Sequence, residues 1–226
     1  MDISLYYQSY GNGFPLVLLH GNGGDSNYFA QQVPYFSRFR RVIALDTRGH
    51  GKSPRGTAPF SIRQFAEDLL HFLDEQNLPQ VDLLGFSDGG NIALTFAAKY
   101  PHRIRRLVLN GANFHPSGIK THIQLPIVLG YRTTALLALK SSRVQQNAEL
   151  LRLMVYEPLL RPVDLQRITV PTLVIAGTRD MVKIAHTVQL YRNLPDAQLR
   201  LLPGDHFIAS KTAEAFNQVV GEFLTQ

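Results

Sequence analysis

The chain has 226 residues, of which 45% are hydrophobic and 18% charged, a composition typical of one large folded domain and unlike that of disordered or fibrous proteins. It contains no cysteine, which excludes disulfides, thiolate metal sites and a cysteine nucleophile. The formal net charge is +6, but the basic residues are scattered and no apolar run approaches the about 18 residues of a membrane span, so we expect neither nucleic-acid nor membrane partners. The first residues show no signal-peptide pattern, and we expect a cytoplasmic protein.

The first predicted element is an antiparallel edge of a β-sheet. Residues 3–19 contain two strand-like runs joined by a Gly11-Asn12-Gly13 turn, which is the pattern of a β-hairpin. Short and nearly continuous apolar runs then recur along the chain, as expected of strands that a parallel sheet buries on both faces. These runs are 15–20, 41–46, 81–86, 106–111, 171–177 and 199–204.

Helix-length segments separate these runs. The clearest covers residues 62–76, where Phe65, Leu69 and Leu73 fall on one helical stripe and Ser61 precedes the helix as its N-cap. Strict alternation of strand and helix predicts βαβ units, and therefore a mostly parallel sheet with helices on both faces.

The alternation breaks once, after the fourth apolar run. Residues 114–170 read as helices punctuated by proline and glycine, which predicts a helical insertion over the sheet, with residues 1–113 and 171–226 forming the core domain. The insertion carries seven Lys or Arg and three Asp or Glu residues, and so holds +4 of the formal charge of +6. We interpret this excess as a solvated helical face, with an anion-binding role as the alternative.

A glycine-rich stretch, Gly85-Phe86-Ser87-Asp88-Gly89, lies between an apolar run and a helix-like segment. A turn this abrupt forces the serine into a strained backbone conformation that exposes its hydroxyl group, and the helix directs the positive end of its dipole toward that point. The pattern G-x-S-x-G alone is weak, because a glycine-rich turn without a catalytic role would look the same. Whether Ser87 is a nucleophile or only a turn residue therefore depends on which residues follow the later strands.

Two later apolar runs end in residues that suit such a nucleophile. Asp180 follows the fifth run and His206 follows the last one, so a carboxylate and an imidazole would meet the serine at the carboxyl ends of the strands. The chain order Ser87, Asp180, His206 is the one expected of this sheet topology. His186 lies in a helix-like segment, where we expect a solvated side chain. We therefore predict Ser87 as the nucleophile, His206 as the base and Asp180 as the group that orients the base.

An oxyanion hole requires backbone N–H donors aimed at the developing negative charge. The loop His20-Gly21-Asn22-Gly23-Gly24 can provide the N–H of Asn22, and Asp88, next to the serine, can provide the other. The same loop could cradle a phosphate, but it lacks the G-x-x-x-x-G-K-[ST] spacing and a nearby lysine. We expect no cofactor and no metal, because neither an H-x-x-x-H pattern nor a carboxylate cluster occurs in the sequence.

Together these residues resemble the α/β-hydrolase superfamily over essentially the whole chain. The resemblance implies a mostly parallel sheet of eight or seven strands with helices on both faces, a Ser-His-Asp hydrolase site and a short helical lid over residues 114–170. The serine motif is most similar to that of small bacterial carboxylesterase-like and valacyclovir-hydrolase-like members. The motifs that carry the resemblance are HGNGG (20–24), DTRGHGKS (46–53), GFSDGG (85–90), Asp180 and His206.

The chain departs from the family pattern next to two of these residues. Asp88 stands where many members carry Met or Leu, and Asp205 stands where Gly is common. A carboxylate beside the nucleophile would attract a substrate ammonium group, or it would cap the helix that begins there, and we favour the cap.

The resemblance implies hydrolysis of a small-molecule carboxylic ester through an acyl-enzyme. Thioester, lactone or carbon–carbon bond hydrolysis and perhydrolysis at the same triad are alternatives, as is a sensor that binds a ligand without turning it over. The small molecule is the only partner we expect, and the protein would be a monomer or a homodimer. The candidate apolar walls of the substrate pocket, which are otherwise core residues, are Phe86, Tyr28, Phe29 and Phe114.

Overall fold

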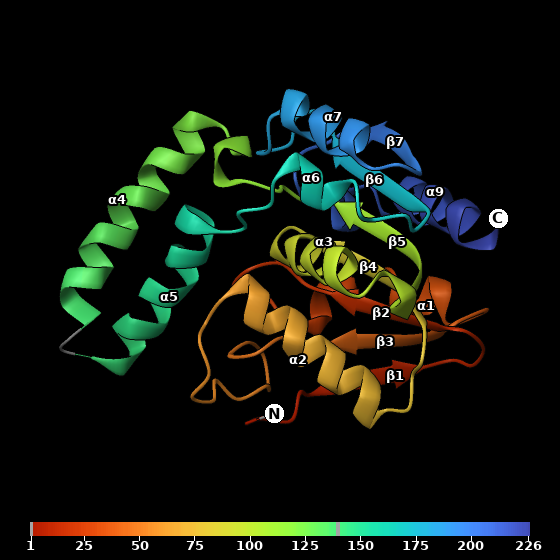
Figure 1. The fold of residues 1–226 in the computed structure, drawn as a ribbon, viewed down its shortest axis with the longest axis horizontal. Helices are drawn as coiled ribbons and strands as arrows, with labels where there is room; N and C mark the ends of the chain where they lie inside the picture. The colour runs from red at the N-terminus through yellow and green to blue at the C-terminus, as the bar shows by residue number, and fades with distance from the viewer. Residues whose placement is uncertain (1, 139–140) are drawn as a thin grey trace.

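A computed structural model describes residues 2–138 and 141–226. Its strands are β1 (Tyr7–Tyr10), β2 (Pro15–Leu19), β3 (Arg41–Leu45), β4 (Val81–Phe86), β5 (Ile104–Asn110), β6 (Thr172–Gly177) and β7 (Ala197–Leu202). In the described residues these seven strands form one sheet in the order β1-β3-β2-β4-β5-β6-β7 (Figure 1). All neighbouring strands run parallel except β1, which is antiparallel to β3 at the edge. The mostly parallel sheet is confirmed, with the smaller of the two expected strand numbers.

The predicted hairpin is wrong, because β1 pairs with β3 rather than with β2. β2 lies inside the sheet between β3 and β4, so neither of its edges is left for β1. The turn between β1 and β2 packs against the chain that precedes β3. Gly11 has a φ of +71°, and a Cβ there would lie 2.2 Å from the carbonyl oxygen of Ser37. The expected antiparallel edge is therefore present, but with a different partner.

Helices cover both faces of the sheet, as predicted. They are η1 (Ser26–Phe29), α1 (Val33–Phe36), α2 (Ile62–Glu75), α3 (Asp88–Lys99), η2 (Pro101–Arg103), α7 (Ile184–Asn193), α8 (Ile208–Lys211) and α9 (Ala213–Thr225). Side chains of α2, α3 and α7 fill the core on one face, and those of α1, α8 and α9 fill it on the other. Ser61 caps α2 as predicted, since its Oγ accepts the N–H of Gln64 at 3.1 Å.

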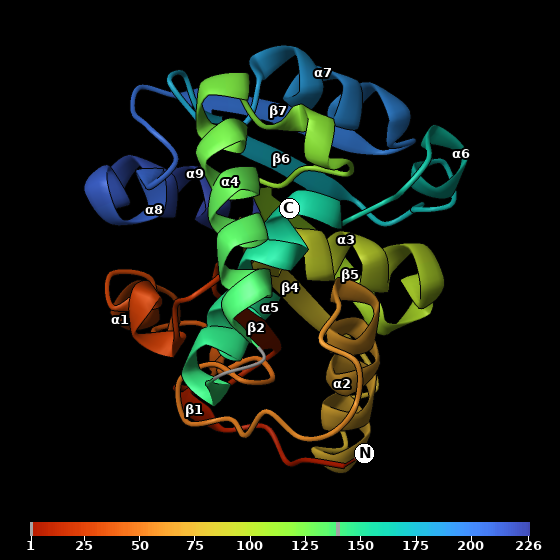
Figure 2. The ribbon, with the colours of Figure 1, turned by 90° about the vertical axis from the view of Figure 1, so that its left-hand side faces the viewer.

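Between β5 and β6 the chain leaves the sheet. This segment contains η3 (Pro116–Gly118), α4 (Thr121–Leu137), α5 (Ser142–Tyr156) and α6 (Pro162–Leu165). α4 and α5 pack against each other as a helical hairpin that stands off the carboxyl ends of the parallel strands (Figures 1 and 2). Residues 139 and 140, which belong to the predicted insertion, lie outside the described residues.

α5 is the helix of this hairpin that is fixed to the core. The carboxylate of Glu149 accepts two hydrogen bonds from Arg55, at 2.6 and 2.8 Å, and the Leu150 carbonyl accepts the side-chain amide of Asn22 at 2.8 Å. In α4, which the structure describes in full, no residue is buried. Within the described ranges, no helix has both the length and the apolar character needed to cross a bilayer.

The turn after β3 holds the loop after β2 in place. Asp46 accepts the N–H of Ser26 through Oδ1 and the N–H of Lys52 through Oδ2, each at 2.8 Å. Arg48 is fully buried and donates two hydrogen bonds of 2.7 Å to Asp68 of α2. The DTRGHGKS motif is thus a structural link between the β2 loop and α2.

Replacing Asp68 by alanine tests this link. Asp68→Ala leaves the buried guanidinium of Arg48 with the partly exposed Asp2, and we expect the free energy of unfolding to fall by about 3–5 kcal/mol. Asp74→Ala, on the same helix and paired with Arg103 at the surface, is the matched control and should lower it by less than about 1 kcal/mol. Urea unfolding measures both values, and equal losses would contradict a structural role for the buried pair.

Candidate active site

Ser87 is the single residue between β4 and α3, and its backbone is strained, with φ +54° and ψ −121°. Close packing enforces this conformation. A Cβ on Gly85 would lie 2.2 Å from the Gly89 carbonyl oxygen, and a Cβ on Gly89 would lie 2.1 Å from that of Leu19. Only glycine lets α3 approach β2 so closely, and the structure therefore has the sharp turn that the sequence predicts.

The structure brings Ser87, His206 and Asp180 together from three strand ends. Ser87 Oγ lies 2.9 Å from His206 Nε2, and His206 Nδ1 lies 2.7 Å from Asp180 Oδ1. Asp180 is fully buried and also accepts the N–H of Val182 at 2.9 Å. A carboxylate that accepts the Nδ1 proton leaves Nε2 as the acceptor for the serine hydroxyl, which is the arrangement that a Ser-His-Asp triad requires.

His20 orients the loop that follows β2. Its Nε2 accepts the N–H of Thr47 at 3.1 Å, and its Nδ1 donates to the Gly21 carbonyl at 2.7 Å. Burial lowers the pKa of His20 below its ordinary value, which favours the neutral ring that this pair of hydrogen bonds requires. The oriented loop lies against the serine, because a Cβ on Gly21 would lie 3.2 Å from Ser87 Cβ.

Two backbone N–H groups next to this contact remain available. In the described part of the chain, no hydrogen bond uses the N–H of Asn22 or of Asp88. The side chain of Asn22 is occupied elsewhere, since it donates to the Leu150 carbonyl of α5. Both N–H groups can therefore serve an oxyanion that forms at Ser87.

The space beside the serine is nearly closed. A cavity of about 10 Å³ lies against Ser87 and His206, which is room for one water molecule at most. Met154 of α5 and Met181, which follows β6, form part of its wall, and both carry flexible thioether side chains. Met181 and His206 also line an outer cavity of about 280 Å³. The cavity beside Ser87 thus has no room for a ligand larger than water, and Met154 and Met181 are flexible parts of its wall.

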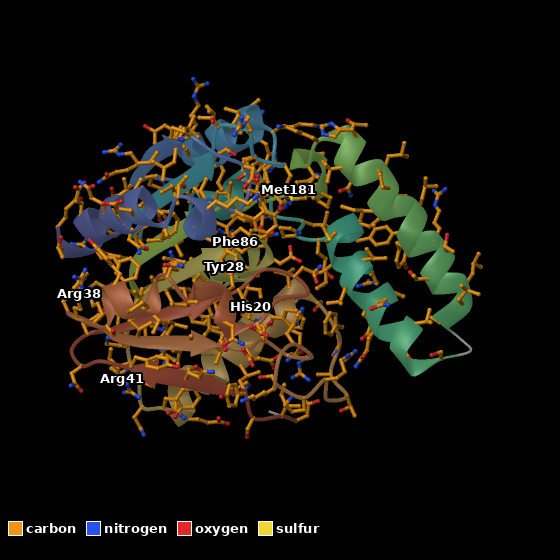
Figure 3. All side chains as sticks on the ribbon, turned by 180° about the vertical axis from the view of Figure 1, so that it is seen from behind. His20, Tyr28, Arg38, Arg41, Phe86 and Met181 are labelled. Carbon is orange, nitrogen blue, oxygen red and sulfur yellow. The ribbon has the colours of Figure 1, made fainter. Side chains whose placement is uncertain are left out.

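Of the predicted aromatic wall residues, Phe86, Phe29 and Phe114 are buried and Tyr28 is half-buried. Phe86 also packs on the triad, with its ring centroid 4.9 Å from that of His206. Phe86 stacks on Tyr28 with ring centroids 4.2 Å apart, and both lie on the side of the core toward the helical hairpin (Figure 3). Phe29 is fully buried, and Phe114 stacks on His186 at 4.1 Å. None of the four aromatics lines either cavity. His186 is buried as well, so the prediction of a solvated side chain there was wrong.

Besides Ser87, Asp88 and His206, the cavity beside Ser87 is lined by residues that the sequence interpretation missed. Met181 and Val182 follow Asp180 directly, so their place after a strand end was a usable signal. Met154 and Glu157 reach the cavity only because α5 docks there, which no local pattern predicts. Besides Asp88, Glu157 is the second acidic side chain of this cavity, and the described residues contain no group of three or more His, Asp or Glu side chains placed to hold a metal ion.

Asp88 presents a buried carboxylate beside the serine. Its Oδ1 accepts the side-chain amide of Asn91 at 3.0 Å, while its Oδ2 has no partner among the described residues. Burial raises the pKa of Asp88 to about 6, and the negative charge of Glu157 acts in the same direction. Among the described residues no backbone N–H donates to this carboxylate, so the helix-capping role favoured from the sequence is not the one observed.

Comparison with known proteins identifies the family. Residues 15–152 match the family model described as alpha/beta hydrolase fold. The chain belongs to this family. The parallel sheet with helices on both faces agrees with that membership.

The relatives of this α/β hydrolase include several named hydrolases. It is 30% identical to 2-hydroxymuconate semialdehyde hydrolase of Pseudomonas putida over 96% of this chain and 89% of the relative. Its identity to 2-hydroxy-6-oxo-2,4-heptadienoate hydrolase of Pseudomonas putida is 43%, over 45% of this chain and 38% of that relative. The structure is also similar to that of the enol-lactonase from Burkholderia xenovorans LB400, with a TM-score of 0.84 and 25% identity over 99% of this chain and 97% of the other.

Gly89→Ala tests the close approach of α3 to β2. The new methyl group would meet backbone atoms that move only with the sheet, and we expect the free energy of unfolding to fall by about 3 kcal/mol or more. Gly130→Ala in α4 is the control, because its Cβ would make an ordinary contact of 3.5 Å with Leu151 and alanine favours a helix by about 1 kcal/mol over glycine. Thermal melting compares the two variants, and a Gly89→Ala protein as stable as the parent would refute the packing argument.

Proposed function

We propose that the protein is a serine hydrolase that cleaves a small-molecule carboxylic ester through an acyl-enzyme, with Ser87 as nucleophile. The observation that carries this proposal is the continuous hydrogen-bond chain from Ser87 through His206 to Asp180, with distances of 2.9 and 2.7 Å. A serine that served only the turn would need no buried imidazole and carboxylate behind it. Membership of the α/β-hydrolase family and the names of its relatives support hydrolytic chemistry.

In the proposed mechanism His206 Nε2 takes the hydroxyl proton of Ser87 as Oγ attacks the acyl carbonyl carbon. The carbonyl oxygen becomes an oxyanion that accepts the N–H groups of Asn22 and Asp88, each of which contributes on the order of a hundredfold in rate. His206 then protonates the departing alcohol, which leaves an acyl ester on Ser87. A water molecule deprotonated by the same imidazole hydrolyses that ester and restores the serine.

The helical hairpin is the proposed lid of this site. Its helix α5 supplies Met154 to the wall of the nearly closed cavity, so a substrate larger than water requires α5 or Met181 to move. The hydrogen bond from Asn22 to Leu150 joins α5 to the loop that offers an oxyanion donor. Opening of the lid and orientation of the Asn22 N–H are therefore coupled.

Ser87→Ala tests the nucleophile. A fluorophosphonate probe followed by peptide mass spectrometry should label Ser87 in the parent protein and nothing in the variant. Hydrolysis of 4-nitrophenyl butyrate should fall by about ten-thousandfold or more, because the activated hydroxyl is lost. Ser9→Ala, on the edge strand β1, is the control and should retain both labelling and turnover. A folded parent protein that takes up no probe and turns over no ester would favour the sensor alternative.

Lactone or carbon–carbon bond hydrolysis is the second candidate function, because relatives are named as an enol-lactonase and as hydrolases of 2-hydroxy-6-oxo acids. The same triad can attack a ring ester or a ketone carbonyl. A panel of size-matched acyclic ester, thioester, lactone and 2-hydroxy-6-oxo acid separates these reactions by kcat/KM. We expect the acyclic ester to be the best substrate, and a higher kcat/KM for another class would reassign the reaction while leaving the triad in place.

Asp88 makes the proposed site selective for cationic acyl groups in a pH-dependent way. Because the pKa of Asp88 is raised to about 6, its carboxyl group is neutral below that pH and charged above it. The ratio of kcat/KM for an aminoacyl ester to that for its des-amino analogue should rise about tenfold between roughly pH 5 and 7, as the charged hydrogen bond to the ammonium forms. Any effect of pH that is common to the two substrates cancels in this ratio.

Asp88→Asn should hold that ratio low and constant with pH. Asp205→Asn is the matched control, since the side chain of Asp205 is 41% exposed and its carboxylate is paired with Lys211 at 2.5 Å, and this variant should keep the rise. A parent protein whose ratio is independent of pH would count against the selectivity.

A further inference from the structure

A large cleft of the described residues lies outside the triad. Its volume is about 690 Å³, within the range typical of small-molecule sites. Its walls are the first turn of α2, the second half of α3, the connection from α5 to α6, and α6 itself, and Figure 1 shows this connection passing beside α3. We call it the α2–α3–α6 cleft, and the residues that define it are Arg63, Thr95, Lys99, Leu159, Asp164 and Arg167.

Glu157 separates this cleft from the cavity beside Ser87, since its side chain lines both. Both of its carboxylate oxygens are engaged. Oε2 accepts the N–H of Ile62 at 2.7 Å, and Oε1 accepts a hydrogen bond from Arg152 at 3.3 Å. The partition therefore has a fixed position and a compensated charge, and a ligand in the cleft occupies a different space from a substrate at Ser87.

The α2–α3–α6 cleft carries an excess of positive charge. Of its four basic side chains, Lys99 and Arg152 pair with carboxylates at 2.5 and 3.3 Å. Among the ion pairs of the described residues, none involves Arg63 or Arg167. The acidic Asp164 is compensated by a neighbouring arginine outside the cleft. Two guanidinium groups thus face the cleft without forming an ion pair, although the charge of Arg63 acts on Glu67 and that of Arg167 on Asp164.

Apolar side chains form much of the remaining wall. Leu159 is 67% exposed and Tyr156 is 49% exposed, which are high values for large apolar residues. The segment that carries them is held against the core, because the Leu160 N–H donates to the Phe114 carbonyl at 2.9 Å. A fixed apolar surface beside unpaired guanidinium groups suits a ligand that is apolar at one end and anionic at the other.

We propose that the α2–α3–α6 cleft is a second binding site, and that its ligand is a small carboxylate with an alkyl or aryl body. The carboxylate would be held by Arg63 and Arg167, whose planar guanidinium groups match it with paired N–H donors. The body would pack on Pro158 and Leu159. This assignment favours the anion-binding alternative for part of the excess of basic residues in the segment 114–170. It does not depend on the proposed function, because no residue of the triad takes part.

Calorimetric titration of the Ser87→Ala protein tests the site. The probe is 4-phenylbutyrate, and 4-phenylbutanol is its neutral analogue with the same apolar body. We expect saturable binding of one acid per chain, and an affinity at least about tenfold lower for the alcohol. We expect the affinity for the acid to fall by the same factor in a Ser87→Ala protein that also carries Arg63→Ala and Arg167→Ala. Higher salt should weaken binding of the acid and leave the affinity for the alcohol unchanged.

The matched control adds Arg38→Ala and Arg132→Ala, which remove two exposed arginines that do not line the cleft, and it should bind the acid like the parent. All four arginines are exposed, so the variants should fold, and melting curves verify this. Any of three results would overturn the proposal. The acid and the alcohol could bind with equal affinity, the control substitutions could weaken acid binding as much as the cleft substitutions do, or the acid could show no saturable binding up to about 10 mM. All titrated proteins lack Ser87, so acid binding and catalysis are tested separately. If the acid binds but the fluorophosphonate does not label the parent protein, only the proposed hydrolase activity is refuted. If the parent protein is labelled but the acid does not bind, only the proposed site in the cleft is refuted.

Discussion

The contact of α3 with β2 across the Ser87 turn is the constraint on which the rest of the site depends. It places backbone atoms of Gly89 where no side chain fits, next to the carbonyl oxygen of Leu19. The strained φ of Ser87 costs on the order of 1–3 kcal/mol, and the surroundings must supply that energy. They do so by burying all six residues of β4 and by engaging both backbone groups of Ser87, in hydrogen bonds of 2.8 Å to the Asn110 carbonyl and 3.0 Å from the Asn91 N–H.

The order of the strands turns this single strained residue into a site. β4, β5, β6 and β7 are neighbours in the sheet and all run parallel, so the loops that follow them open at one edge. Ser87 follows β4, Asp180 follows β6 and His206 follows β7. The three side chains therefore lie within reach of one another although they are far apart in the sequence. The loop after β2 arrives at the same edge, where the hydrogen bonds of His20 and the Asp46 turn hold it against Ser87.

The sequence predicts the parts of this arrangement that a strand end determines. Ser87, Asp180 and His206 were recognisable because each follows an apolar run, and the backbone of a parallel strand fixes what comes next. The partner of β1 was not predictable in this way, since it depends on both edges of β2 being occupied. Burial of Phe114 and His186 against each other, and the approach of Met154 to the serine, depend on how helices dock, and no spacing in the sequence records that docking.

The closed cavity and the Asp88 carboxylate have a common consequence. A buried carboxylate oxygen without a donor destabilises the folded protein, and the cavity that Asp88 lines holds one water at most. A ligand that displaced Met154 or Met181 would exchange flexible apolar contacts for its own, at little loss of packing energy. A ligand that also carried a donor or a positive charge would satisfy Asp88 in the same movement. The residue next to the nucleophile therefore biases which ligands open the cavity, in addition to which ligands fit it once it is open.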